Sequence, residues 1–516
     1  MSAGRMNLAW GMVLGVMSAF GCFSAWAERS SARDVELDAV LQKAAQNYID
    51  NFHSQRGLSA GFKVKVWADL QADLVYIDFG PGVVPEEADS LSEQMEQEVG
   101  TTLLTHALDA GMPDVTQVRT LYGGLPFNHY YPRPPKKDGP DNSYEPRLPG
   151  GLAVVSASHG LFLLHPGRTW DYQRPLVNNV REDLLTPGYA DVLQGYLESR
   201  SSMTVRRARR SDPADHIDSH QPWWMMSSRY HLKALYPQET DIWNSFPGST
   251  THDREMNQDI RARPRYANFI GADALLSIHS NAHADPATRG VEVYYHQDKP
   301  QDQPLADSIL CYMGELIHAQ EGYEEFRVRR PAKFGRHGEN GIASMPSVIV
   351  EVAYHSNPED ALALQDPVFR EASMKGVEKG YRLWREGKAC NPLKVDPIAT
   401  IRVAAGQSRV VDLAFGGYPQ YPVVIETNNV ACPPGWKCTD GAVTLPDPDS
   451  KPAQITLRCE NAGSAPIYWD TRMVDDDGVK SPPVRHIVQC VRGSGVLASP
   501  AAHVGDAQAA TARKLP

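Results

Sequence analysis

Apolar and polar residues recur with distinct periods along the chain, and these periods predict where helices and strands lie. Over 34–52 and 90–110 the apolar residues have the spacing of helices that bury one face. Short runs rich in β-branched and aromatic residues predict strands at 62–67, 74–79 and 115–121. Together these elements predict a small α/β module over residues 28–125.

The pattern changes on both sides of a long central region. Residues 126–150 hold Pro-rich segments that cannot continue a helix or strand, so we expect a linker there. Beyond Cys390 the period becomes that of strands with Gly and Pro turns, which predicts an antiparallel β-sandwich of immunoglobulin-like character over 390–497. The Ala-rich tail at 498–516 is predicted to be disordered. The strand-like runs of the sandwich lie at 400–403, 409–413, 423–426 and 454–458.

The central region, residues 151–389, alternates strand patterns with helical ones. Apolar runs at 151–155, 275–278 and 346–350 predict buried strands, and 290–295 predicts a further strand of alternating character. Strands that alternate with helices imply a largely parallel sheet and therefore the α/β class. In such sheets, ligands and chemistry gather at the carboxyl ends of the strands.

Titratable residues stand at the ends of three of these strands. They are His159, His279 and Glu351, and a further carboxylate, Glu182, precedes a helix whose start is signalled by Pro187. A lone histidine at a strand end more often packs in the core or caps a helix. Two histidines and one carboxylate, however, form a standard zinc triad with an open position for water. A second carboxylate is what metal-assisted hydrolysis needs as general base and then as general acid.

The motifs around these residues resemble those of the zinc-dependent N-acetylmuramoyl-L-alanine amidases of bacterial cell walls. The resemblance implies that His159, Glu182 and His279 bind Zn²⁺, that Glu351 is the catalytic carboxylate and that Asn281 contacts substrate. It also implies a twisted mixed sheet with helices on both faces. The implied reaction cleaves the amide between N-acetylmuramic acid and L-alanine of the peptidoglycan stem peptide. The resemblance covers about 151–386 and is carried by Ser158-His159-Gly160, Arg181-Glu182-Asp183, Arg265 to Ala282, Gly290 to Tyr295, Pro346 to Glu351 and Ser356-Asn357-Pro358.

The sequence departs from the family pattern in three places. Ser156-Ala157-Ser158 stands where the family usually has Asp-Pro-Gly. The run from Leu161 to Tyr172 and the position of Pro187 separate Glu182 from the first histidine and from its helix, so Asp183 is a fallback ligand. An insertion at about 206–258 would cover or gate the cleft, and a regulatory protein would act on it. The alternative is a solvated loop with a small aromatic cluster.

The first 27 residues have the features of a signal peptide. Arg5 is followed by an apolar stretch at 8–20 and by the small-x-small site Ala25-Trp26-Ala27. We expect cleavage near Ala27 and an extracytoplasmic mature chain, either periplasmic or secreted. No later apolar run in the sequence is long enough to span a bilayer.

Charge and cysteine content restrict the partners and the compartment. The net charge of −11 argues against nucleic-acid binding. Beyond the signal peptide, six cysteines remain, and four of them crowd the C-terminal region at 432–490, which indicates disulfides formed in an oxidising compartment. The close spacing of Cys432 and Cys438 is also compatible with a metal site, but no second close cysteine pair or histidine cluster accompanies it.

These observations lead to one functional hypothesis and two alternatives. The hypothesis is a secreted zinc amidase that acts on peptidoglycan. The altered first motif and the insertion motivate the first alternative, a zinc amidase or peptidase with another extracytoplasmic substrate. The second alternative is a non-catalytic cell-wall-binding protein with an amidase-like domain.

Overall fold

The computed structural model describes residues 20–55, 62–132, 150–450, 452–493 and 508–514. The chain forms two compact units, which we describe separately. One comprises residues 1–135 with 334–336, and the other comprises 136–333 with 337–516. The positively charged and apolar parts of the expected signal peptide, up to residue 19, lie outside the described residues.

The first unit has a three-stranded sheet packed against the helices α1 and α2, in line with the strand and helix patterns of the sequence. The strands β1, β2 and β3 lie in that order, β1 antiparallel and β3 parallel to β2. Alternate residues such as Val66, Val75 and Ile77 are buried against the helices α1 and α2, because successive strand residues point to opposite faces. The elements are α1 (Phe20–Gln55), β1 (Lys65–Asp69), β2 (Leu74–Asp78), η1 (Pro81–Val83), α2 (Ser90–Asp109), β3 (Gln117–Leu121) and α3 (Phe127–Tyr130). Helix α1 passes through the expected cleavage position at Ala27.

Strands β11, β13, β10, β4 and β7 of the second unit lie in that order in a mixed sheet. Strands β7, β4, β10 and β13 are mutually parallel, and β11 runs antiparallel to β13. Every residue of β10, β11 and β13 is buried, as expected of strands covered on both faces. The strands are β4 (Leu152–Ala157), β7 (Thr204–Arg207), β10 (Ala274–Asn281), β11 (Glu292–His296), β12 (Lys333–Gly335) and β13 (Ser347–Tyr354).

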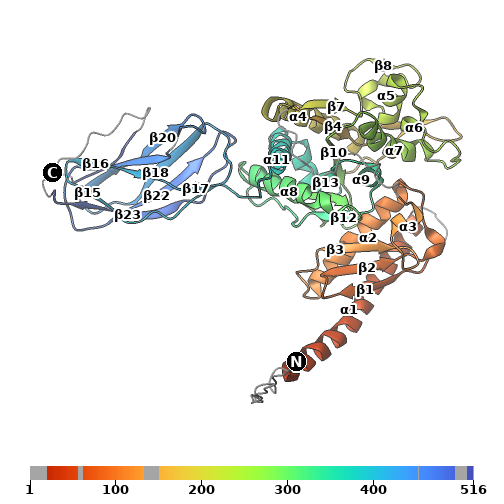
Figure 1. The fold of residues 1–516 in the computed structure, drawn as a ribbon, viewed down its shortest axis with the longest axis horizontal. Helices are drawn as coiled ribbons and strands as arrows, with labels where there is room; N and C mark the ends of the chain where they lie inside the picture. Colours follow the sequence, from red (N-terminus) through yellow and green to blue (C-terminus); the bar gives the residue numbers. More distant parts are fainter. Residues whose placement is uncertain (1–19, 56–61, 133–149, 451, 494–507, 515–516) are drawn as a thin grey trace, which may run out of the picture. The chain divides into compact units, whose positions relative to one another are not determined.

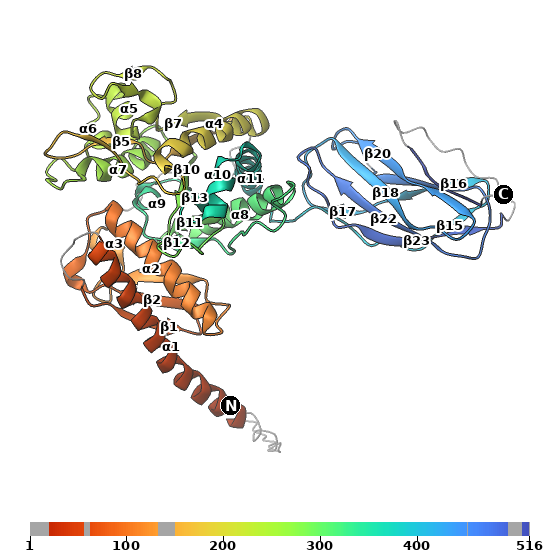
Figure 2. The same ribbon diagram turned by 180° about the vertical axis from the view of Figure 1, so that it is seen from behind.

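Helices cover both faces of this sheet, which confirms the predicted α/β architecture (Figures 1 and 2). One face carries α4 (Glu182–Ser201), α8 (Gln303–His318) and α11 (Pro367–Arg385). On the other face, Val154 and Leu275 pack against Ala262 and Tyr266 of α7. The remaining helices are α5 (Ser228–Leu235), α6 (Thr240–Trp243), α7 (Arg254–Phe269), α9 (Gly338–Ile342) and α10 (Pro358–Gln365), with η2 (Trp223–Met225) and η3 (Pro300–Asp302). Two short hairpins are β5 (Leu161–Leu163) with β6 (Trp170–Tyr172) and β8 (Asp215–His216) with β9 (Gln221–Pro222).

Helix α4 begins at Glu182, which corrects the expectation that Pro187 separates Glu182 from its helix. Proline has no N–H, so the carbonyl of Asp183, four residues earlier, lacks its usual helical donor. Arg209 Nη2 donates to that carbonyl at 2.7 Å. The helix therefore continues across Pro187 with its carbonyl satisfied, and Glu182 is fixed in its first turn.

The segment at 206–258 is folded into the second unit, so the solvated-loop alternative is wrong for most of it. Its first residues end β7 of the central sheet, and Arg209 is fully buried. Leu232 of α5 and Ile242 of α6 join the core beside α7. The expected aromatic cluster exists and is joined by a buried histidine, with neighbouring ring centroids 4.7–5.7 Å apart among Trp170, His216, Trp223 and Tyr230.

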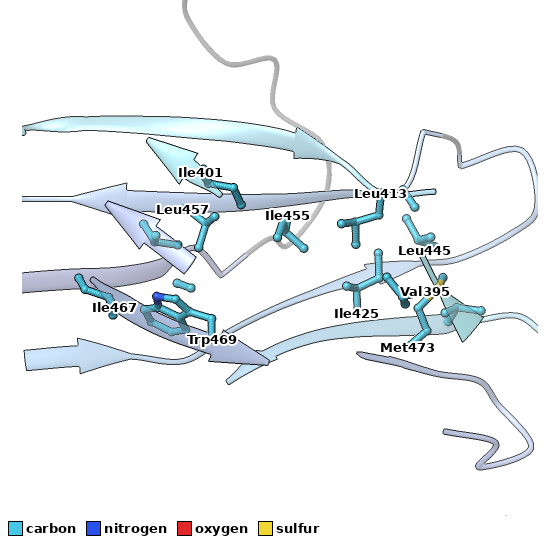
Figure 3. Packing of buried hydrophobic residues seen from close by; sticks show 14 of the residues in the cluster. Val395, Ile401, Leu413, Ile425, Leu445, Ile455, Leu457, Ile467, Trp469 and Met473 are labelled. Atoms are coloured by element: carbon cyan, nitrogen blue, oxygen red, sulfur yellow. The ribbon is translucent and has the colours of Figure 1, made fainter. Parts of the chain in front are cut away.

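The C-terminal part of the second unit is a β-rich domain of two main sheets, ordered β15-β23-β22-β18-β20 and β16-β21-β24-β19. Figure 3 shows Ile425 and Trp469 of the first sheet facing Ile455 and Leu457 of the second across a shared core. Not every pair is antiparallel as expected, because β15 runs parallel to β23 and β24 parallel to β21. The strands are β14 (Lys394–Val395), β15 (Ile401–Ala404), β16 (Gln407–Asp412), β17 (Phe415–Gly416), β18 (Val423–Ala431), β19 (Trp436–Thr439), β20 (Gly441–Leu445), β21 (Gln454–Cys459), β22 (Ile467–Val474), β23 (Val484–Val491) and β24 (Ala510–Lys514).

The tail contributes a strand, so the prediction of disorder over 498–516 is wrong at 510–514. Strand β24 lies between β21 and β19 and buries Ala510 and Ala512. Alanine has a low strand propensity. Strand β24 nevertheless forms, because the small side chains of Ala510 and Ala512 fit into the core. Residues 498–507 of the expected tail lie outside the described part of the chain.

All six predicted disulfide cysteines are paired. The bonds join Cys311 to Cys390, Cys432 to Cys438 and Cys459 to Cys490. The Cys432–Cys438 spacing is therefore that of a disulfide, not of a metal site. Among the described residues, no helix is both long and apolar enough to cross a membrane.

Candidate active site

Three separate elements bring His159, Glu182 and His279 together at the carboxyl-terminal ends of strands β4 and β10 of the central sheet. His159 follows β4, Glu182 begins α4 and His279 lies near the end of β10. Glu182 Oε1 lies 3.4 Å from His159 Nε2 and 3.1 Å from His279 Nδ1. One ligand atom from each residue falls within 4.8 Å of the others, and all three residues are buried. The structure thus groups the three residues that the resemblance implies as metal ligands.

The local backbone that carries His159 is tightly constrained. Gly160 has a φ of +111°, and a Cβ atom there would meet the Ser227 backbone nitrogen at 2.7 Å. Glycine is therefore required in the turn that follows His159. Arg209 Nη1 donates to the carbonyl oxygen of Ser158 at 3.4 Å. Arg209, which belongs to the basic run at 206–210, therefore stabilises the turn that carries His159.

Glu182 is held by donors on both sides of the cluster. Its Oε1 accepts from the Ser158 hydroxyl at 3.0 Å and from the Ser280 backbone N–H at 3.1 Å. Arg174 places its Nε 3.7 Å from Glu182 Oε2 and is partly exposed. These contacts keep Glu182 Oε1 directed between the two histidines.

The electrostatics of the cluster differ between its members. Burial and the nearby Arg174 hold the pKa of His159 well below its ordinary value. For His279, burial lowers the pKa, but Glu339 and Glu182 outweigh it and raise the pKa to about 10. Burial raises the pKa of Glu182, yet the two histidines hold it well below the usual range. The lowered pKa values keep Glu182 ionised and His159 neutral, so both can offer a lone pair.

The donor set suits a divalent metal ion. Two imidazole nitrogens and one carboxylate oxygen form the ligand set of catalytic zinc sites. Among the described residues, His159 Nε2 is a buried nitrogen without a hydrogen-bond partner, although Glu182 Oε1 lies within 3.4 Å. A metal ion between these atoms would satisfy that nitrogen.

Glu351 lies on the strand beside His279. The two residues are paired in register on the parallel strands β10 and β13, so their side chains point to the same face of the sheet. Glu351 is 5% exposed. The catalytic carboxylate implied by the resemblance therefore shares a face with the second histidine and can face a substrate held there.

Asn281 and Asp183 are engaged within the fold. The Asn281 amide donates to Glu292 at 3.2 Å, and its oxygen accepts from the Ala282 N–H at 2.8 Å. Asp183 accepts three backbone N–H groups, from residues 160, 173 and 174, at 2.9 to 3.0 Å. Among the described residues, Asp183 is absent from the group that could hold a metal ion, so the geometry favours Glu182 over this fallback.

Sequence analysis missed two residues that surround His279 and His159. Glu339, in the short helix α9, places Oε1 3.1 Å from His279 Nε2. Arg263, on α7, contacts both Glu339 and Asp259, and its Nη2 lies 3.4 Å from His159 Nδ1. Arg263 lies two residues before the stretch that carries the resemblance, which begins at Arg265. The only available signal was the helical spacing of Asp259 and Arg263, four residues apart.

Residues 165–381 match the model of the N-acetylmuramoyl-L-alanine amidase family. The match includes Glu182, His279 and Glu351 and begins after His159, where the first motif departs from the family pattern. The chain is 27% identical over 118 residues to the probable cell wall amidase LytH of Staphylococcus aureus. That alignment covers 22% of this chain and 36% of LytH, so it spans about a third of the relative's length.

Two solved structures that resemble this chain are amidases. The catalytic domain of CwlV, from Bacillus (Paenibacillus) polymyxa var. colistinus, is 17% identical, with a TM-score of 0.31 over 46% of this chain and 99% of that domain. AmiC2 of Nostoc punctiforme is also 17% identical, with a TM-score of 0.28 over 46% of this chain and 97% of AmiC2. Over residues 165–381, this chain is therefore similar to the N-acetylmuramoyl-L-alanine amidase family.

Proposed function

We propose that this protein is a zinc-dependent N-acetylmuramoyl-L-alanine amidase, which hydrolyses the amide between N-acetylmuramic acid and L-alanine of the peptidoglycan stem peptide. The observation that carries the proposal is the buried cluster of His159, Glu182 and His279 beside Glu351, largely within the segment that matches the amidase family. His159, Glu182 and His279 would hold the zinc ion. Zinc at this position supplies Lewis acidity to the scissile carbonyl and to the hydrolytic water.

The residues of the chain account for the remaining steps. Glu351, as general base, takes a proton from the attacking water and then delivers it to the departing L-alanine nitrogen. The bond between the lactyl carbonyl carbon and that nitrogen breaks, which leaves a carboxylate on the sugar and a free amine on the peptide. Asn281, at the end of β10, is proposed to contact the substrate, and Glu292 holds its amide in place.

Product analysis on purified sacculi tests this proposal. Full-length protein loaded with zinc should release stem peptides that begin with L-alanine, identified by mass spectrometry. Cleavage of a different amide would favour the alternative of another extracytoplasmic substrate, to which the altered motif before His159 also points. Absence of both zinc binding and cleavage would favour a non-catalytic wall-binding protein.

Substitution of Glu351 by glutamine separates catalysis from metal binding. Glu351→Gln should retain zinc and lose activity by about 10²–10⁴-fold, the usual contribution of general acid–base catalysis. His279→Ala should lose both zinc and activity, because it removes a ligand. Zinc content is measured by elemental analysis and activity by release of free amino groups. Near-normal turnover by Glu351→Gln would exclude Glu351 from the mechanism.

The extracytoplasmic location and a regulatory partner are also part of the proposal. Three disulfides support an oxidising compartment. A signal peptide cleaved near Ala27 would deliver the chain there, and N-terminal sequencing of exported protein tests the position. A regulator that acts on residues 206–258 would have to contact a segment packed on α7, because Leu232 and Ile242 belong to the core.

A further inference from the structure

Two different carboxylates face the two ring nitrogens of His279. Nδ1 lies 3.1 Å from Glu182 Oε1, which also approaches His159, whereas Nε2 lies 3.1 Å from Glu339 Oε1. Nδ1 therefore faces the cluster proposed to hold the metal, and Nε2 faces away from it, toward α9. Glu339 is not among the residues that could share the metal with the cluster.

Glu339 is held in a fixed position by a buried arginine. Arg263 is fully buried, and its Nη1 contacts Glu339 Oε1. Its Nη2 contacts Asp259, one helical turn earlier on α7. Glu339 is itself 2% exposed, so neither partner can exchange this contact for water. The guanidinium thus fixes the carboxylate that meets His279.

This arrangement selects one tautomer of His279. A neutral imidazole that binds a metal through Nδ1 carries its proton on Nε2, and a carboxylate that accepts this N–H fixes both the tautomer and the ring orientation. The same arginine reaches the other histidine, since its Nη2 lies 3.4 Å from His159 Nδ1. The buried ion pair of Glu339 and Arg263 therefore contacts both histidines, His279 through Nε2 and His159 through Nδ1.

We propose that Glu339, anchored by Arg263, is the positioning residue of the metal site. It accepts the Nε2–H of His279 and directs the Nδ1 lone pair toward Glu182 and His159. The proposal rests on the proposed function, because it assumes that these three residues hold zinc. The competing explanation is that the pair of Glu339 and Arg263 only joins α9 to α7.

Glu339→Gln separates these explanations, with Glu378→Gln as the matched control. Glutamine is nearly isosteric and removes the charge. Glu378 is likewise a fully buried carboxylate in an ion pair, with Arg382 at 2.8 Å, but it lies on α11 away from the metal cluster. Zinc affinity of the full-length protein is measured by competition with a chromophoric chelator. Glu339→Gln should weaken zinc binding about 10- to 100-fold, the usual effect of losing such a partner. Glu378→Gln should leave the affinity unchanged.

A second readout detects the tautomer directly. Nitrogen-15 NMR of the zinc-loaded protein should show the His279 proton on Nε2 in the wild type and a mixed or altered ring signal in Glu339→Gln. Thermal unfolding of both variants shows whether each is folded. Wild-type zinc affinity and tautomer in folded Glu339→Gln would overturn the positioning role, whatever the amidase activity is. If the wild type binds zinc but releases no L-alanine-terminated peptide, the proposed function fails while the comparison of zinc affinities still decides the role of Glu339. If the wild type binds no zinc, both proposals fail.

Discussion

At the scale of single residues, the altered motif before His159 contributes to the candidate site. Ser158 stands where the family usually has glycine, and its hydroxyl lies 3.0 Å from Glu182 Oε1. A glycine could not make this contact. The same hydroxyl lies 2.7 Å from the carbonyl oxygen of Ile278, so its single proton is shared between that oxygen and the proposed ligand.

Glu292 is a buried carboxylate on strand β11 of the central sheet. The shift of its pKa predicts how the stability of the protein depends on pH. Burial raises its pKa, but Lys333 at 2.5 Å and Arg329 outweigh this and lower the pKa from 4.5 to about 2. A carboxylate with a depressed pKa stabilises the fold above its unfolded pKa, and this contribution is lost as the pH falls toward 2. At 1.36 kcal/mol per pH unit, the contribution is about 3 kcal/mol.

Glu292→Gln should therefore lower the thermal midpoint at pH 7 and flatten its fall between pH 5 and pH 2. Calorimetry at a series of pH values measures both effects. The control is Glu359→Gln, which breaks the exposed pair with Arg289 and should destabilise the protein far less. An unchanged acid profile in Glu292→Gln would show that Glu292 contributes no such stability.

The sequence indicated the residues proposed to bind the metal but not the residues around them, for a physical reason. His159 follows β4 and His279 lies near the end of β10, so the proximity of the two histidines followed from the parallel sheet. Glu351 lies within β13, which continues to Tyr354, and its pairing with His279 brings it to the same site. Glu339 stands in a helix of five residues, too short for a periodic signal. Its partner Arg263 is 76 residues away, and only the folded chain brings them together.

At the scale of elements, most helices and strands could be predicted from the periodicity of apolar residues. The predictions were wrong where tertiary contacts determine whether an element forms or where it begins. Pro187 signals a helix start, yet α4 begins five residues earlier because Arg209 satisfies the carbonyl that proline leaves without a donor. Residues 510–514 contain a single β-branched side chain, that of Thr511, yet they form β24 between two strands. Neither the contact of Arg209 nor the pairing of β24 with its two neighbours can be predicted from the local sequence.

The contact between α8 and α11 depends on two glycines. A Cβ atom at Gly376 or Gly380 would meet the backbone of Met313 or Ile309 on α8 at 2.5 Å. These glycines lie four residues apart on one face of α11, so they allow the helices to approach closely. Any larger side chain must push the helices apart.

Gly380→Ala should therefore destabilise the protein by about 1–3 kcal/mol, the usual effect of overpacking a core. Gly195→Ala in α4 is the matched control, because nothing lies within 4 Å of its Cβ position. It should be neutral or stabilising by up to about 1 kcal/mol, since alanine favours helix. Thermal unfolding followed by circular dichroism compares the two. Equal midpoints would contradict the close packing.

At the scale of the whole molecule, the C-terminal domain depends on the last strand of the chain. Strand β24 joins β21 to β19, and a chain that ends at Ala507 lacks it. Such a truncation should lower the unfolding midpoint of this domain and speed its proteolysis, because it exposes the core around Ala510 and Ala512 and leaves β19 without a neighbour in its sheet. Truncation after Lys514 retains β24 and serves as the control. Identical proteolysis of the two would show that β24 is dispensable.

The place of β24 has a consequence for biosynthesis. Residues 407–459 supply the neighbouring strands of this sheet, but the strand that joins them arrives about fifty residues later, at 510–514. During synthesis these residues still lie within the ribosome when the rest of the domain has emerged. The sheet is therefore completed only after residue 514 has left the ribosome.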